Sequence, residues 1–160
     1  MTVRRLGAEQ IRDAALTATG ELDGTRGGPG GDNASSRRSV YLKVLRNKRD
    51  DLLDVFDVPD GSSSIPERNV TTTPTQSLLM INGPWMLARA KALAERIERE
   101  QSSTTKEQKI SAVYSNLFGR APTANEYAVA AKFLGDGKTK ERLIDLCHVL
   151  LNSNEFLYVD

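Results

Sequence analysis

The second half of the chain shows the clearest hydrophobic pattern, with apolar residues recurring every three or four positions. A period of about 3.6 residues is typical of helices that bury one face. Four helices are predicted here, and the short segments between them favour antiparallel packing of consecutive helices. Their expected buried stripes are Met86, Ala90, Leu93, Ala94 and Ile97; Ile110, Val113, Tyr114, Leu117 and Phe118; Tyr127, Ala130, Ala131 and Leu134; and Leu143, Leu146, Cys147 and Leu150.

Capping signals indicate where two of these helices begin and where one ends. Thr105 followed by Gln108, and Thr123 followed by Glu126, have the spacing of a capping box. In that motif the threonine hydroxyl accepts from the backbone, and the longer side chain accepts in return from the threonine N–H. Gly119 is expected to end the earlier helix, because glycine readily adopts the left-handed conformation common at helix C-termini.

The first half of the chain has a weaker pattern. Residues 8–18 predict a helix that ends at Gly20, and residues 50–56 predict a short helix. Between them, residues 24–36 are rich in glycine and carry almost nothing apolar to bury, so we expect a mobile loop. Residues 37–45 have the β-branched and aromatic content of a strand, although no second strand is evident to pair with it.

Residues 68–84 are the stretch around which the rest of the chain is expected to be organised. Thr73 is an acceptable helix cap, and Pro74 suits the first helical position, where a missing N–H loses no partner. Residues 78–81 are all apolar, which is too many in a row for one exposed face, and Asn82 with the Gly-Pro after it ends the helix. We therefore expect a short buried helix whose best site candidates are the polar residues at its mouth.

Together these patterns predict a single, mostly α domain over residues 1–160. Residues 85–160 are expected to form a C-terminal antiparallel helical bundle. Residues 1–84 are expected to form an irregular, loop-rich half with one candidate short strand. A chain of 160 residues is long enough to bury a core of this kind.

Composition narrows the functional classes. Apolar residues make up 39% of the chain and charged residues 27%, which is ordinary for a globular domain. The net charge of +1 provides no electrostatic footprint for nucleic acid, and no apolar run approaches the ~20 residues that span a bilayer. Cys147 is the sole cysteine, which excludes an intrachain disulfide and a cysteine zinc cluster and indicates a core residue. We therefore expect no nucleic-acid partner and no membrane span.

Polar residues around the central stretch form the leading candidate site: Arg38, Asp57, Asp60, Arg68, Thr73, Gln76 and Asn82. In one interpretation they line a pocket in which two guanidiniums hold a carboxylate, a sulfate or sugar hydroxyls. In the other, arginine–aspartate pairs fasten irregular loops to the helices, and the amides satisfy loop carbonyls. The structural interpretation is favoured, because an irregular segment of this length has many backbone groups that need partners.

A weaker candidate lies on the last predicted helix, where Glu141, Asp145, His148 and Asn152 share one stripe. Carboxylates and a histidine at this spacing can hold a divalent metal, or a carboxylate can orient the histidine as a base. The simpler interpretation is that this stripe is the solvent-exposed side of an amphipathic helix, because it lies opposite the apolar face. The sequence contains no nucleophile paired with a base, no second histidine and no cofactor fingerprint. We therefore expect no metal, no cofactor and no catalysis by the isolated chain.

Several short motifs occur in a specific order: RRSVY at 37–41, FDVPD at 56–60, residues 68–76, NGP at 82–84, LFGRAPT at 117–123 and LNSNEF at 151–156. In this order they resemble the uncharacterised DUF1553 family of planctomycetes and related bacteria. Members are typically large predicted secreted proteins that carry this domain at the C-terminus, behind a DUF1549 domain and often a cytochrome c-like segment. The resemblance implies a carboxy-terminal fragment of a larger extracytoplasmic protein, and it implies no activity.

The chain departs from the family pattern in one loop. Members often have a cysteine shortly before the central arginine, where this chain has serines at 62–64, so a thiol-based role for that loop is not expected. There is also no Cys-x-x-Cys-His motif for covalent haem attachment.

The leading functional hypothesis is a non-catalytic binding or assembly module of a larger extracytoplasmic protein. Its expected partners are upstream domains of the same polypeptide, or a polysaccharide or sulfated sugar. The alternative hypothesis is a contribution to a hydrolytic or redox active site that upstream domains complete.

Overall fold

The computed structural model describes residues 3–32, 34–45, 51–58, 66, 71–100, 105–135 and 139–159. Over these residues the chain is mostly helical, with one small antiparallel strand pair, so the predicted fold class is confirmed. The elements are β1 (Arg4–Arg5), α1 (Ala8–Thr19), a 3₁₀ turn (Ser39–Tyr41), α2 (Asp51–Val55), α3 (Pro74–Asn82), α4 (Pro84–Glu100), α5 (Lys106–Phe118), α6 (Ala124–Leu134), α7 (Thr139–Leu151), α8 (Asn154–Leu157) and β2 (Tyr158–Val159).

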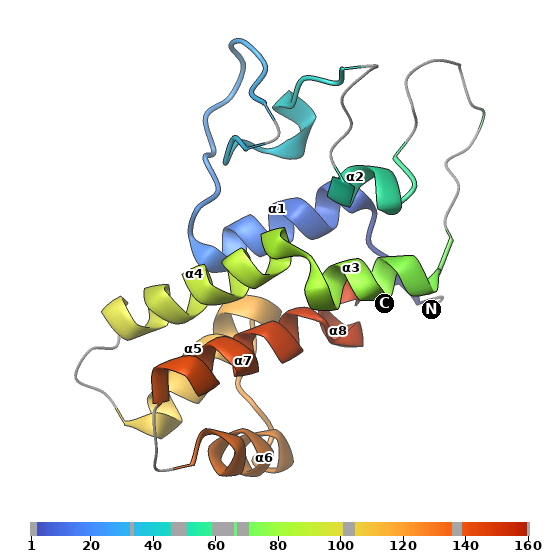
Figure 1. Cartoon of the computed structure of the whole chain (residues 1–160). Coiled ribbons are helices and arrows are strands. Elements are labelled where there is room, and N and C mark those ends of the chain that lie inside the picture. The colour runs from blue at the N-terminus through green and yellow to red at the C-terminus, as the bar shows by residue number, and fades with distance from the viewer. Residues whose placement is uncertain are drawn as a thin grey trace.

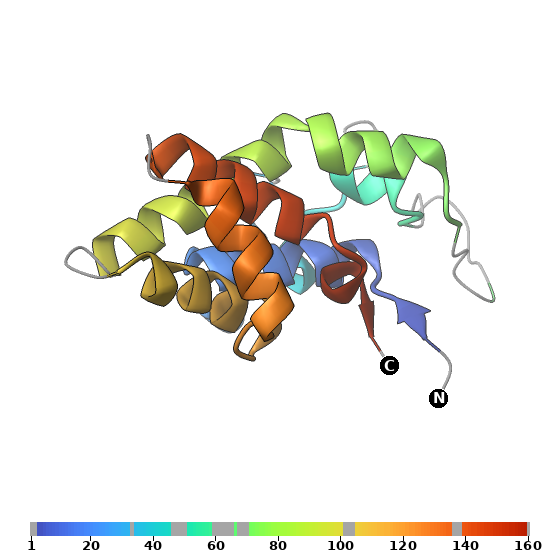
Figure 2. The same cartoon turned by 90° about the horizontal axis from the view of Figure 1, so that it is seen from below.

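Helices α4 and α7 form the centre of the molecule and make the most extensive contact between any two described elements (Figure 1). Helix α1 packs on α4, and α6 lies on the opposite side of the bundle from α1. Strands β1 and β2 pair, so the two ends of the described chain lie close together (Figure 2). None of the helices in the described ranges is long and apolar enough to cross a bilayer.

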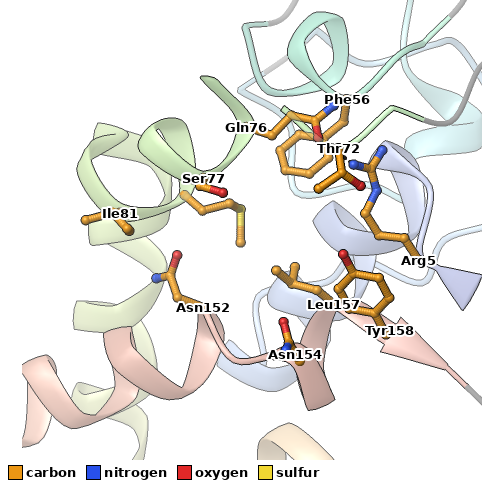
Figure 3. Close-up of a pocket in the computed structure, with 11 residues that line it drawn as sticks. Arg5, Phe56, Thr72, Gln76, Ser77, Ile81, Asn152, Asn154, Leu157 and Tyr158 are labelled. Atoms are coloured by element: carbon orange, nitrogen blue, oxygen red, sulfur yellow. Dashed lines mark hydrogen bonds between the residues drawn. The ribbon is translucent and has the colours of Figure 1, made fainter. Parts of the chain in front are cut away.

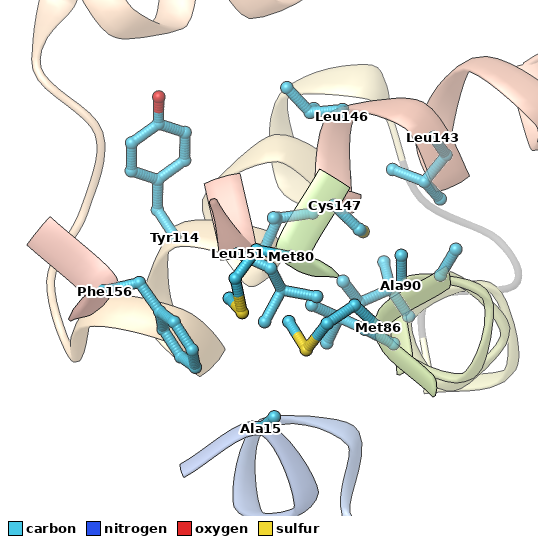
Figure 4. Packing of buried hydrophobic residues seen from close by; sticks show 14 of the residues in the cluster. Ala15, Met80, Met86, Ala90, Tyr114, Leu143, Leu146, Cys147, Leu151 and Phe156 are labelled. Carbon is cyan, nitrogen blue, oxygen red and sulfur yellow. The ribbon is translucent and has the colours of Figure 1, made fainter. Parts of the chain in front are cut away.

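Each helix from α1 to α8 contributes buried side chains to the core, and Figure 4 shows those from α1, α3, α4, α5, α7 and α8. The stripe predicted on α4 is correct at every position, because each of its side chains is at most 1% exposed: Met86, Ala90, Leu93, Ala94 and Ile97. Cys147 is fully buried here, and this burial raises the pKa of its thiol. A thiol in this environment is a small core group and not a reactive one.

The buried face of α7 differs from the prediction in its last turn. Leu143 and Cys147 are fully buried as expected, but the next buried residue is Leu151, whereas Leu150 is only partly buried. Positions 143, 147 and 151 are four residues apart, so the row that faces α4 continues in steps of four through the end of the helix.

The predicted capping signals are found in the structure. Thr123 Oγ1 accepts from the Glu126 N–H at 3.3 Å, while a Glu126 carboxylate oxygen accepts from the Thr123 N–H at 2.7 Å. Gln108 likewise accepts from the Thr105 N–H at 3.0 Å. Gly119 ends α5 with φ of +69°, a conformation that strains any residue with a Cβ atom.

Helix α3 is not the buried helix that its apolar run predicts. Leu78 and Ile81 are 58% and 51% exposed, whereas Gln76 and Met80 are only 3% and 2% exposed. Helices α2 and α4 cover one side of α3, and the buried residues 76 and 80 are one helical step of four apart. The helix is therefore buried on one side only, with two large apolar side chains facing outward.

Residues 37–45 do not form the predicted strand. They contain the 3₁₀ turn and take part in two isolated parallel bridges, Asp23 with Arg37 and Gly31 with Leu42. Val40, in the 3₁₀ turn, is 70% exposed, so this segment has no apolar face to pack as a strand. Ser39 is instead fixed to α1, because its N–H and hydroxyl donate to Asp13 at 2.8 and 2.7 Å.

Two arginines hold the glycine-rich loop and the residues after it by hydrogen bonds that the composition does not predict. Arg37 donates to the carbonyls of Pro29 and Gly27, and its guanidinium lies 4.7 Å from the centre of the Tyr41 ring. Arg12 on α1 is 1% exposed and donates to the carbonyl of Arg37 at 2.9 Å. Charged groups hydrogen-bonded to several backbone carbonyls can substitute for apolar anchors in such a loop.

Arg120, in the turn between α5 and α6, connects three helices. Its guanidinium donates two bonds to Glu126 on α6, at 2.8 and 2.6 Å, and two to Glu155 on α8, both at 2.7 Å. It also lies 5.6 Å from the ring of Tyr114 and 5.7 Å from that of Phe118 on α5. The planar guanidinium suits this site, because only arginine offers paired donors and a flat face together.

We expect acid to weaken this part of the bundle. The hydrogen bonds from Arg120, followed by those from Thr123, lower the pKa of Glu126 to about 2, whereas an unfolded glutamate titrates near ~4.3. The unfolded chain then takes up the proton first, so stability present above ~4.3 is lost as the pH falls toward about 2. Urea unfolding at several pH values measures this loss, and Glu126→Gln should flatten the dependence over that interval. An unchanged slope in the variant would show that another group is responsible.

Candidate functional site

The structure divides the predicted polar cluster. Asp57, Thr73 and Gln76 lie together where α2 meets α3. Arg38 lies elsewhere, with a side chain that is 57% exposed and 3.8 Å from Asp13 on α1. Asn82 is exposed at the far end of α3. Asp60 and Arg68 lie outside the described residues.

Asp57 is the acceptor at the centre of the assembled group. It follows α2 with φ of +64°, an uncommon backbone conformation that aspartate tolerates better than most residues. Its carboxylate accepts from the Thr71 N–H at 2.8 Å and from the Thr71 hydroxyl at 2.8 Å. These bonds join the end of α2 to the segment that leads into α3.

Arg5 on β1 supplies the cation of this group. Its Nη2 lies 3.2 Å from Asp57 Oδ2, and its Nη1 donates to the carbonyl of Thr71 and to Gln76 Oε1. The guanidinium also lies 5.3 Å from the centre of the Phe56 ring. The Arg5 side chain is 7% exposed and that of Asp57 is 18% exposed, so the pair is largely shielded from water.

Gln76 completes the group from the first turn of α3. Its Oε1 accepts from the Thr73 N–H at 3.1 Å, and its Nε2 donates to the carbonyl of Val55 at 3.0 Å. Thr73 accepts in return from the Gln76 N–H at 3.3 Å, which makes Thr73 the helix cap that the sequence predicts. The amide therefore joins α2 to the start of α3.

The electrostatic balance of the group favours an ionised Asp57. Burial by itself would raise the pKa of this carboxyl, but the hydrogen bonds from Thr71 and Arg5 outweigh that effect and hold the pKa below its usual value. The Arg5 charge is thereby neutralised within the protein.

A cleft of about 290 Å³ opens beside this group, between α3 and the segment that runs from the end of α7 through α8 to β2 (Figure 3). Arg5 and Gln76 lie in its wall. Its apolar lining consists of Phe56, Met80, Ile81 and Leu157, and its other polar lining consists of Thr72, Ser77, Asn152, Asn154 and Tyr158. A mixture of apolar surface with a few hydroxyl and amide groups is typical of small-molecule sites.

The polar groups of the cleft face one another from two sides. In Figure 3, Asn152 and Tyr158 lie on either side of Leu157, and Ser77 and Thr72 lie across the opening from them. The Asn152 Nδ2 donates to the carbonyl of His148 at 2.8 Å, which leaves its Oδ1 as an acceptor for a ligand.

The weaker predicted site on α7 is not assembled. Glu141 and Asp145 are exposed, and His148 is half-buried with its Nε2 3.2 Å from the carbonyl of Met80. Because a carbonyl can only accept, this nitrogen carries the proton, and the ring ties α7 to α3. Within the described ranges, no three histidine, cysteine, aspartate or glutamate side chains gather in a way that could hold a metal ion.

Sequence reasoning did not find Arg5 or Tyr158 as candidates. Arg5 is 52 residues from Asp57, and Tyr158 is its partner in the β1–β2 pair, so only the pairing of the two chain ends places them at the cleft. Asn152 and Asn154 both belong to a tail motif that the chain shares with the resembled family, and Asn152 also lies on the polar stripe noted on the last predicted helix.

The family model described as Protein of unknown function (DUF1553) matches residues 1–134. The chain belongs to the DUF1553 family. The matched region of this DUF1553 chain runs from β1 through α6, whereas α7, α8 and β2 lie beyond it. The cleft is therefore lined from both parts. No curated protein and no solved structure matches the chain.

Proposed function

We propose that this DUF1553 chain is a non-catalytic binding module and that the cleft between α3 and the C-terminal segment is its ligand site. The observation that carries this proposal is the lining of the cleft, which combines apolar surface with inward hydroxyl and amide groups. Helix α3 forms much of one wall, and α8 with β2 forms much of the other, so regular secondary structure holds most of the lining. Preformed sites lose less free energy on binding than sites that must be ordered.

The lining also argues against catalysis in this cleft. The described residues that line it include no aspartate, glutamate, histidine or cysteine. General acid–base and nucleophilic catalysis depend mainly on such groups, and the serine and threonine hydroxyls of the cleft have no base among the lining residues to activate them. Completion of a hydrolytic or redox site by upstream domains is therefore the less favoured proposal.

Assembly with another domain is the second candidate function, and a groove between α6 and α7 is the observation that favours it. Its lining is almost wholly apolar and includes Val129, Phe133 and Val149, which are 70%, 45% and 63% exposed. Contiguous exposed apolar side chains often mark a contact surface. Upstream domains of the same polypeptide, in an extracytoplasmic protein, are the partners that the family resemblance suggests.

The cleft can be tested with a panel of small probes: neutral sugars, uronic and sulfated sugars, amino acids and nucleosides. A ligand gains about 0.3 kcal/mol per heavy atom at the low end, so a probe of about a dozen heavy atoms should bind with a Kd on the order of 1 mM. We expect at least one class to shift the NMR signals of Ser77, Asn152 and Tyr158 in the isotope-labelled chain.

A matched pair of variants shows whether such shifts report the cleft. Ser77→Trp places a bulky side chain at the opening and should abolish them, whereas Ser111→Trp, on the exposed face of α5, should not. If probes of every class leave the cleft signals unchanged, or if the shifts survive Ser77→Trp, the proposed function is wrong.

A further inference from the structure

We infer that the cleft takes a neutral, hydroxyl-rich ligand: an uncharged pyranose unit of a glycan. This inference rests on the proposed binding function of the cleft, and it concerns which chemical class the cleft selects. Three properties of the lining carry it: the absence of an available charge, the kind of hydrogen-bonding groups, and the shape of the apolar surface.

The charge of the described lining disfavours anionic ligands. Among the described residues that line the cleft, Arg5 alone carries a formal charge. Its two terminal nitrogens are already bound to Asp57, Thr71 and Gln76, its Nε has no partner but is buried, and its side chain is 7% exposed. A carboxylate, sulfate or phosphate in the cleft would lose hydration without gaining a free cation, which disfavours its transfer from water.

The hydrogen-bonding groups match hydroxyls. Thr72, Ser77 and Tyr158 each offer a hydroxyl that can donate or accept, depending on how it rotates. Asn152 offers its Oδ1 as an acceptor, since its Nδ2 is bound to the His148 carbonyl. A ligand whose own groups both donate and accept can pair with all of these, and the hydroxyls of a sugar have that property.

The apolar part of the cleft matches the C–H face of a sugar ring. Leu157 lies between Asn152 and Tyr158, so polar groups flank an apolar surface (Figure 3). A nucleobase would instead gain most from stacking on an exposed aromatic ring. Phe56 does not offer its ring, because it is 5% exposed beneath the Arg5 guanidinium, and Tyr158 is the one other aromatic ring among the described lining residues.

The decisive comparison uses four probes of similar size at the same ionic strength: a neutral glucose disaccharide, the same disaccharide with one unit oxidised to a glucuronic acid, the same disaccharide carrying one sulfate, and adenosine. We expect the neutral disaccharide to bind in the cleft at least about tenfold more tightly than any of the others, measured by NMR titration. Tighter binding of a charged sugar or of adenosine would overturn the inference while leaving the cleft as a binding site. If none of the four probes reaches the cleft, the inference is wrong, and the proposed function fails with it only if the amino acids of the wider panel also leave the cleft signals unchanged.

Tyr158→Phe tests the hydroxyl itself, since it keeps the ring and removes one hydrogen-bonding group. Loss of one neutral hydrogen bond should weaken disaccharide binding by about 2–10-fold. Tyr127→Phe is the control, because the Tyr127 hydroxyl binds Glu107 on α5, away from the cleft. Equal effects of the two variants, or none from Tyr158→Phe, would contradict the assigned role of this hydroxyl and with it the hydroxyl-matching argument.

Discussion

Replacing Leu93 with alanine is expected to lower the free energy of unfolding by about 2–5 kcal/mol. Leu93 lies on α4, is 0% exposed, and belongs to the helix pair that forms the centre of the molecule. The substitution removes buried methyl groups and leaves a cavity between helices whose backbones are held by their other contacts. Urea unfolding followed by circular dichroism measures the change.

Leu87→Ala is the matched control on the same helix. Leu87 is 44% exposed, so its truncation removes little buried surface and should cost less than about 1 kcal/mol. Similar losses at the two positions would contradict the packing of α4 described here. The comparison holds residue type and helix constant, which leaves burial as the variable.

Replacing Arg5 with alanine is expected to cost about 3–5 kcal/mol, because it leaves the Asp57 carboxylate shielded from water without its cation. The side chains of Arg5 and Asp57 are 7% and 18% exposed, and Arg5 also donates to Thr71 and Gln76. Thermal or urea unfolding measures the loss. Arg5→Lys should restore only part of it, since lysine cannot donate to three partners from a planar fork.

Two further variants show whether the loss of stability comes from breaking the Arg5–Asp57 pair or from removing any charge. Arg5→Met combined with Asp57→Asn removes both charges, so the double variant should be less destabilised than the sum of the two single ones. Arg38→Ala breaks an exposed pair with Asp13 and should cost only about 0–1 kcal/mol. If Arg5→Ala unfolds like Arg38→Ala, the Arg5–Asp57 pair does not stabilise the fold.

Much of the helical half of this protein could be predicted from its sequence, because the relevant signals are local. The stripe on α4 repeats within the length of a single helix, and all of its positions are buried. The capping box at Thr123 and Glu126 spans three residues, and Gly119 ends α5 next to it. Such signals depend on backbone geometry within one or two turns, which is set before any tertiary contact is specified.

Predictions that depended on the tertiary neighbours of a segment were less reliable. The apolar run of α3 suggests burial on all sides, but only one side of that helix is covered, and Leu78 and Ile81 remain exposed. Residues 37–45 have strand-forming composition, yet Ser39 binds Asp13 and the only described strand pair is β1 with β2. A strand requires a neighbour, and composition within the segment cannot supply one.

The sequence by itself therefore determined the helices, their caps and most of their buried faces. Only the tertiary structure decided the candidate site. The cleft combines Arg5 from one end of the chain, Ser77 from its middle, and Tyr158 from the other end. Residues so far apart have no spacing rule that relates them, because their proximity comes from the pairing of β1 with β2 and the packing of α3 beside α7 and α8. Tertiary structure also pairs the Arg5 charge with Asp57, which lies far from it in the sequence.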